Sequence, residues 1–88
     1  MIFIDFIDKL AQSMDAPEVI PGISKITIVS DTAVVVENYD GVCEYTNELI
    51  YIRLKKKMLE ICGSELNIEY LSENTASISG KIHSVGFV

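Results

Sequence analysis

From Lys25 onward, apolar and polar residues alternate with a period of two, and this alternation restricts the possible folds more than any other feature. Successive side chains of a β-strand point to opposite faces, and the alternating runs are rich in β-branched residues between turn signals. The pattern predicts a mainly β fold of about seven to eight short strands arranged as a meander, a roll or a short solenoid-like stack. The expected strands are residues 25–30, 33–38, 42–46, 48–54, 57–62, 65–71, 75–79 and 81–87.

The same alternation separates an expected dry face from an expected wet face. The expected core consists of Ile26, Ile28, Val34, Val36, Ile50, Ile52, Leu54, Leu59, Ile61, Leu66, Ile68, Ile78, Ile82, Val85 and Phe87. The residues between them that should face water are Glu60, Asn67, Glu69, Ser77, Ser79, Lys81 and His83.

Two local patterns add detail to the β region. Asp40-Gly41 lies between two strand-like runs and predicts a tight hairpin, because glycine reaches positive φ values without steric cost. Gly63 and Gly80 belong to a faint repeat with a spacing of 17 residues, which suggests two similar hairpin units stacked on each other. We expect these glycines at strand ends or corners.

The first part of the chain has a helical pattern. Apolar residues recur at helical spacing over residues 2–14, and Asp5 and Asp8 lie on the opposite side. This predicts one amphipathic helix, followed by a connector over residues 15–24 that contains two prolines. The helix could cover its own sheet or bind a partner.

The composition limits the classes of function. Eighty-eight residues suit a single domain, 1–88, and the net charge of −6 disfavours nucleic acid and anionic lipid surfaces. The one basic cluster, Arg53 and residues 55–57, is expected to be a solvated turn. The longest run without a charged residue has 7 residues, so no membrane span and no secretory signal are expected. Two cysteines, Cys43 and Cys62, are too few for a disulfide framework; we expect both to be buried and the setting to be cytoplasmic.

Patterns typical of catalysis are weak. The chain has one histidine and no metal-binding, nucleophile or phosphate-loop pattern, so no cofactor, metal or catalytic residue is expected. A rival hypothesis is an enzyme in which His83 works with a nearby carboxylate. A second rival is a small-ligand-binding β module in which Tyr39, Tyr45 and Tyr51 line a pocket.

Protein binding is the leading hypothesis. Short strands leave sheet edges with unpaired N–H and C=O groups that can pair with a partner or with another copy, so a homo-oligomer is expected. Apolar residues on a face that should be wet are candidate contacts. The candidate protein-binding residues are Leu49, Tyr51, Tyr70, Phe3 and Phe6.

Several ordered segments resemble the YabP/YqfC family of sporulation proteins. The segments are Glu37-Asn38-Tyr39-Asp40-Gly41, residues 44–46, residues 59–68 with Gly63, residues 78–82 with Gly80, and residues 85–87. Ser30 and Asp31 replace a glycine that is common in the family, and residues 1–14 carry no family hallmark. The resemblance implies a structural protein of the mother cell compartment that takes part in building the spore envelope, alongside a membrane-bound sporulation protein. It also implies that the signature residues are structural.

Overall fold

Six antiparallel strands form one sheet in the computed structural model, which describes residues 22–88. The strands follow the order β1-β2-β6-β5-β4-β3 across the sheet. Their bounds are β1 (Lys25–Val29), β2 (Ala33–Glu37), β3 (Gly41–Tyr45), β4 (Leu49–Arg53), β5 (Met58–Leu71) and β6 (Thr75–Phe87). The mainly β prediction is confirmed for this part of the chain. The expected helix over residues 2–14 and the connector up to residue 21 lie outside the described residues.

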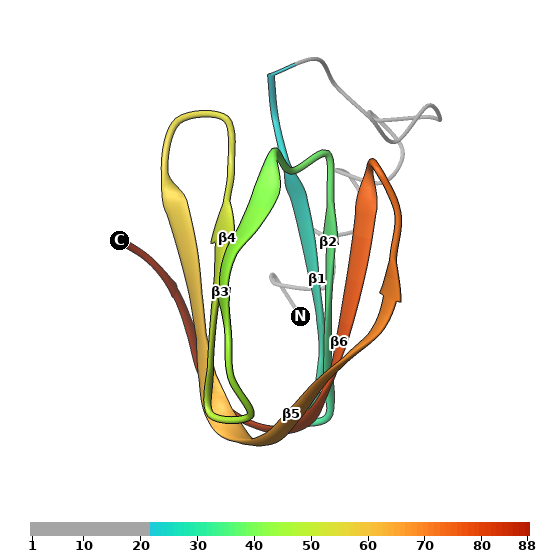
Figure 1. Cartoon of the computed structure of the whole chain (residues 1–88), viewed down its shortest axis with the longest axis vertical. Helices are drawn as coiled ribbons and strands as arrows, with labels where there is room; N and C mark the ends of the chain where they lie inside the picture. Colours follow the sequence, from blue (N-terminus) through green and yellow to red (C-terminus); the bar gives the residue numbers. More distant parts are fainter. Residues whose placement is uncertain (1–21) are drawn as a thin grey trace, which may run out of the picture.

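The two longest strands bend and fold the sheet into two layers that enclose the core (Figure 1). Layer 1 contains β1, β2, residues 75–79 of β6 and residues 67–71 of β5. Layer 2 contains β3, β4, residues 58–62 of β5 and residues 84–87 of β6. Strands β5 and β6 therefore run through both layers, and each layer ends in a short hairpin on one side.

Glycines make the bend possible. A Cβ atom at Gly63 would lie 2.0 Å from the carbonyl oxygen of Lys81, so the two backbones approach too closely there for any side chain. A Cβ atom at Gly80, whose φ is +138°, would lie 2.6 Å from the carbonyl oxygen of Glu65. The prediction that these glycines occupy corners is confirmed.

Each corner is held by the turn of a neighbouring hairpin. The amides of Gly80 and Ile82 donate to the carbonyls of Thr32 and Asp31, in the β1–β2 turn. In the other half of the molecule, the amides of Gly63 and Leu66 donate to the carbonyls of residues 48 and 47, in the β3–β4 turn. The molecule thus consists of two similar units, β1-β2-β6 and β3-β4-β5.

The number of strands and the meaning of the internal repeat differ from the prediction. The expected strands at residues 57–62 and 65–71 form one strand, β5, and those at residues 75–79 and 81–87 form β6. Ladder pairing continues past each corner with shifted register, because a glycine or an irregular residue bends the strand without ending it. The repeat spaced by 17 residues therefore marks two bent strands that pair with each other, and the prediction of stacked hairpins is wrong.

The predicted hairpin at Asp40-Gly41 is also wrong. Strand β2 pairs with β1 and β6, whereas β3 pairs with β4, so residues 38–40 pass between the two layers. Asn38 has the positive φ of 62°, and its side-chain amide donates to the carbonyl of Ile23. The turn in this segment is thus made at Asn38, where an asparagine tolerates the left-handed region.

Ser30 lies in the β1–β2 turn, directly after β1. Its φ is 52°, a left-handed conformation that glycine adopts without the steric cost that a Cβ brings.

Most of the expected core is buried, with exceptions on edge strands. The buried apolar residues are Val34, Val36, Tyr39, Ile50, Ile52, Leu54, Leu59, Ile61, Leu66, Ala76, Ile78 and Ile82. Tyr39 and Ala76 were not among the expected core residues. Ile28 and Phe87 were, but they are 55% and 58% exposed, because Ile28 lies on the edge strand β1 and Phe87 lies in the part of β6 that pairs only with β5. Cys43, expected to be buried, is exposed beside the β3 bulge.

The expected wet face is largely confirmed. Asn67, Glu69, Lys81 and His83 are exposed, whereas Glu60, Ser77 and Ser79 are partly covered.

Candidate protein-binding surface

The candidate binding residues from the sequence do not form one patch. Leu49 and Tyr51 are half-buried on the outer face of layer 2, where the Tyr51 hydroxyl donates to Glu60 at 2.8 Å. That hydrogen bond raises the pKa of Tyr51, with burial and the negative charge of Glu60 adding to the effect. Tyr70 is 58% exposed and lies in the other layer, opposite Ser77. Phe3 and Phe6 lie outside the described residues.

The three tyrosines of the ligand-binding hypothesis also lie apart. Tyr39 is buried and donates a hydrogen bond to the carbonyl of Ser72, which ties the β2–β3 connector to the β5–β6 turn. Tyr45 lies at the edge of layer 2, and Tyr51 lies on its outer face. The hypothesis of a single pocket lined by all three tyrosines is therefore wrong.

His83 is exposed on β6, and within residues 22–88 it has no hydrogen bond or ion pair to a carboxylate. No group of three or more potential metal ligands occurs in this part of the chain. No helix in the same region is long and apolar enough to cross a membrane. The rival enzyme hypothesis thus lacks an acid partner for His83 among the described residues.

The edges of the two layers face each other along two lines, one on each side of the sandwich, which we call seams. The open seam runs between β1 and residues 84–87 of β6, and the closed seam runs between β3 and residues 67–71 of β5. Register places Ile26 and Ile28 of β1, and Val85 and Phe87 of β6, on the inner face of their layers. Ile26 and Val85 contact the core. Ile28 and Phe87 also face inward, but nothing covers them fully and they are exposed to solvent.

A tyrosine crosses the closed seam. The Tyr45 hydroxyl donates to the side-chain oxygen of Asn67 at 3.1 Å and accepts from the amide of Ile68 at 3.3 Å. Tyr45 pairs with Ile50 of β4, and the corresponding pair in the other unit is Ile28 with Val34 of β2. Ile28 therefore occupies the position of Tyr45 but has no hydroxyl to bridge the open seam.

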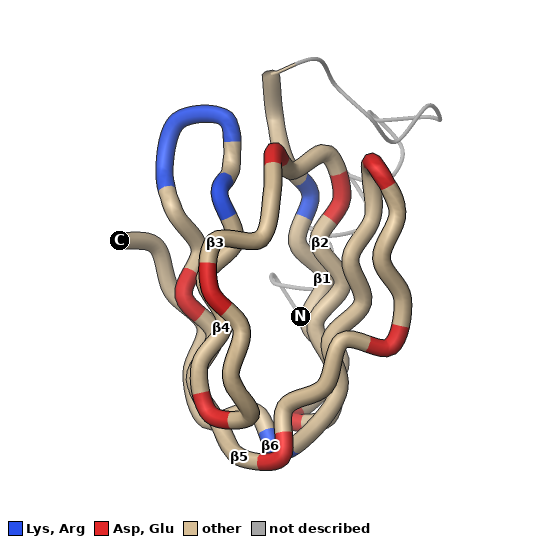
Figure 2. The backbone as a smooth tube through the Cα atoms, in the orientation of Figure 1, with Lys and Arg blue, Asp and Glu red and all other residues tan. Residues whose placement is uncertain are grey.

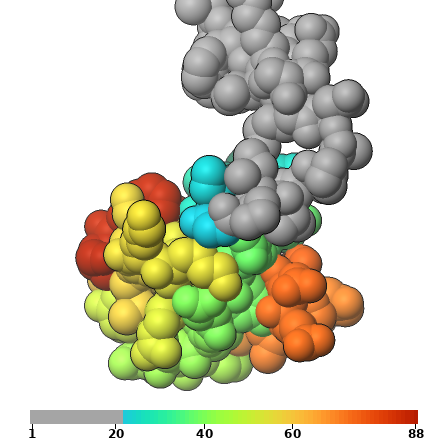
Figure 3. Space-filling view, turned by 90° about the horizontal axis from the view of Figure 1, so that it is seen from above, coloured from blue at the N-terminus to red at the C-terminus, as the bar shows by residue number. Residues whose placement is uncertain are grey.

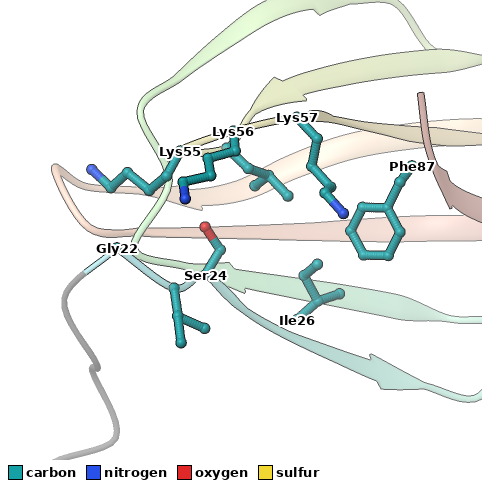
Figure 4. A pocket seen from close by; sticks show the side chains of 9 residues that line it. Gly22, Ser24, Ile26, Lys55, Lys56, Lys57 and Phe87 are labelled. Carbon is teal, nitrogen blue, oxygen red and sulfur yellow. The ribbon is translucent and has the colours of Figure 1, made fainter.

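A cavity of about 300 Å³ lies at one end of the open seam. Figure 4 shows Ile26 and Phe87 on its apolar side and the basic turn of residues 55–57 along its rim. The Lys57 ammonium lies 5.0 Å from the centre of the Phe87 ring, a cation–π contact. Gly22, where the described chain begins, lines the same cavity, and Figure 3 shows this start next to the β4–β5 turn.

The rim is the main basic region of the described structure. In Figure 2 the largest group of blue residues lies on and beside the β4–β5 turn, whereas acidic residues are spread over the rest of the tube. Lys55 is paired with Asp40. Lys56 is exposed and has no ion pair with another described residue. An apolar surface beside a basic rim can bind a protein segment that is apolar on one side and acidic on the other.

The sequence pattern could not locate this surface. Its residues alternate like core residues, and only the strand order shows that β1 and the end of β6 are edges.

Comparisons with known proteins agree with the family-like segments. The model of the YabP family matches residues 22–88, which is also the span that the structure describes. No curated protein and no solved structure matches the chain.

Proposed function

The chain belongs to the YabP family and is a sporulation-related protein, and we propose that it is a non-catalytic scaffold that binds other proteins through the open seam. Building of the spore envelope is the process we assign to it. The observation that carries the proposal is the pair of exposed, inward-facing side chains at Ile28 and Phe87, in a fold whose other seam is bridged.

The backbone along the open seam supports the same function. Met58 and Val88 exchange both of their backbone hydrogen bonds. Because bonded and non-bonded pairs alternate in an antiparallel ladder, the polar backbone groups of Val85 and Phe87 point away from β5. An added strand can use these groups, as in β-augmentation.

The family match and the exposed apolar surface support the partners that we propose. We propose that the seam receives a segment of another envelope protein, such as a membrane-bound sporulation protein, and that copies of the chain associate through the same seam. On this proposal the protein works in the cytoplasm of the mother cell and reaches the membrane only through its partner.

Light scattering with paired substitutions tests the proposal. Phe87→Lys places a charge in the open seam, and Leu71→Lys is the matched control, since Leu71 is 56% exposed at the corresponding end of β5. We expect the wild-type chain to associate with itself or with candidate envelope proteins, and Phe87→Lys to weaken that association at least about tenfold. Leu71→Lys should bind like the wild type. A monomer that binds no candidate, or equal loss in both variants, contradicts the proposal.

A further inference from the structure

The two seams differ in what the edge residues offer to the backbone opposite. Paired residues form two equivalent rows across the layers, which are Ile28, Val34, Ile78 and Ile68 in layer 1 and Tyr45, Ile50, Ile61 and Val85 in layer 2. At the closed seam, the hydroxyl of Tyr45 accepts a hydrogen bond from the amide of Ile68 at 3.3 Å. The open seam has the other two ends of these rows, Ile28 and Val85, on its edges. The side chain of Ile28 contains no acceptor, so it cannot bind the amide of Val85 in the same way.

Both edges of the open seam carry backbone groups that can pair with an added strand. The carbonyl of Val29 accepts from the amide of Thr32 in the β1–β2 turn, so the polar groups of the preceding residue, Ile28, point away from β2. On β6, the polar groups of Val85 and Phe87 point away from β5. Packed sheets lie about 10 Å apart and paired strands about 4.8 Å apart, so one strand placed between the two edges is at pairing distance from both.

We propose that the segment bound by the open seam is a single extended strand with an alternating apolar pattern and an acidic residue at one end. It pairs with β1 on one side and with residues 84–87 of β6 on the other, and thereby closes the sheet into a barrel. The inference rests on the proposed function, and it adds the conformation and the sequence pattern of the partner.

The side chains of the seam require the alternating pattern. Ile28 and Phe87 face inward and are 55% and 58% exposed. Successive residues of a strand point to opposite faces, so every second side chain of the added strand lies against these residues, and an apolar side chain there gains free energy by covering them. A helix cannot replace the strand, because its backbone groups are already bonded within the helix and it is about 10 Å wide.

Charge determines which end of the strand is acidic. Ile26 and Phe87 line the cavity at one end of the open seam, and the lysines of residues 55–57 form its rim (Figure 4). In this rim, Lys56 is exposed and has no ion pair with another described residue. The net charge of −6 repels a partner that is acidic along its whole length, so a carboxylate is favourable only beside this rim.

Synthetic peptides added to the full chain test the inference by NMR. The probe is a seven-residue peptide with blocked termini, in which valine and threonine alternate and both end residues are glutamate, so that a carboxylate reaches the rim in either strand direction. We expect bound peptide to slow hydrogen exchange at the amides of Val85 and Ile28 at least about tenfold. The amide of Ile68, already bound by Tyr45, is the control and should keep its rate. A peptide of the same composition with its three valines adjacent should bind at least about tenfold more weakly.

Charge reversal tests the acidic end separately. Lys56→Glu should weaken the glutamate-ended peptide about fivefold and strengthen a lysine-ended peptide. Lys81→Glu is the matched control, because it makes the same change of charge at an exposed lysine outside the cavity. The control should leave the ratio of the two affinities unchanged.

Several outcomes overturn the inference. They are failure of the alternating peptide to bind, equal binding of the peptide with adjacent valines, unchanged exchange at Val85 in the bound state, and an unchanged affinity ratio in Lys56→Glu. A Val85 amide that self-association protects and that no peptide protects further also overturns it, because a second copy then fills the seam. The Phe87→Lys and Leu71→Lys pair judges the proposed function separately: an envelope protein that loses binding only in Phe87→Lys supports that function even if the peptides fail.

Discussion

Tyr39 shows how one residue of the family signature stabilises the fold. Its ring is buried in the core, and its hydroxyl donates to the carbonyl of Ser72 across 33 positions of sequence. This bond joins the segment that passes between the layers to the turn that links the long strands.

Removal of this hydroxyl should have a measurable cost. We expect Tyr39→Phe to lower the free energy of unfolding by about 1 kcal/mol, because the ring stays buried and the carbonyl of Ser72 loses its donor. Urea denaturation measures the change. Tyr70→Phe is the control, since Tyr70 is exposed and should lose no more than a few tenths of a kcal/mol. Equal effects at both positions would contradict the role assigned to Tyr39.

The same hydroxyl predicts a loss of stability at alkaline pH. Burial raises the pKa of Tyr39 above its ordinary value of 10.0, so the folded protein holds this proton more tightly than the unfolded chain does. The resulting stability is fully present below pH 10.0 and is lost as the pH rises through the raised pKa. Denaturation midpoints between neutral and strongly alkaline pH should therefore fall less in Tyr39→Phe than in the wild type. Identical slopes would show that another group controls the alkaline transition.

Alternation predicted which residues face inward, but it could not predict how far each one is covered. Val34 and Ile28 belong to the same pattern, yet the first is fully buried and the second is 55% exposed. Coverage depends on whether another strand or layer lies over the residue, and that depends on contacts between distant parts of the chain. Tyr39 was missed for the same reason, because it lies outside any strand and is buried by the fold as a whole.

At the scale of the elements, the corners of β5 and β6 should tolerate no side chain. We expect Gly63→Ala and Gly80→Ala each to destabilise the protein by about 3 kcal/mol or more, since the added Cβ would meet backbone atoms that cannot move separately. Gly86→Ala is the matched control within β6, because a Cβ there meets nothing within 4 Å. Thermal unfolding followed by circular dichroism measures all three. A Gly86→Ala variant as unstable as the corner variants would refute this explanation.

The strand content of β1 to β4 could be predicted closely from the sequence, whereas the continuity of β5 and β6 could not. A glycine between two alternating runs has the same local signature whether the chain turns back or bends and continues. At Gly63 and Gly80 the outcome is decided by the carbonyls of the neighbouring hairpin turns, which accept the amides at each corner. Those acceptors lie far away in the sequence, so no local pattern contains this information.

At the scale of the whole molecule, the hydrogen bonds that Tyr45 makes across the closed seam should keep the two layers from separating there. Tyr45→Phe removes the acceptor for the amide of Ile68 and the donor to Asn67. We expect the amide of Ile68 to exchange its hydrogen faster in this variant, while amides in the core of β4 and β6 keep their wild-type rates. Amide exchange followed by NMR measures the effect. An unchanged rate at Ile68 would show that the layers are held together there without the tyrosine.

The order of the strands and the asymmetry of the seams could not be predicted from the sequence. Both follow from pairings between segments on opposite sides of the β3–β4 hairpin, such as β2 with β6. The candidate site could not be predicted for the same reason, because the open seam consists of residues from the first and last described strands. The protein-binding hypothesis rested on the presence of sheet edges, and the structure identifies which edges carry exposed apolar residues.

Strands β5 and β6 belong to both layers, and their ladder continues through the bend. Neither layer can unfold on its own, because separating β5 from β6 in one layer would also expose the backbone hydrogen bonds between them in the other layer. We therefore expect one cooperative unfolding transition. A mechanical load applied to either layer would be shared by backbone hydrogen bonds in both.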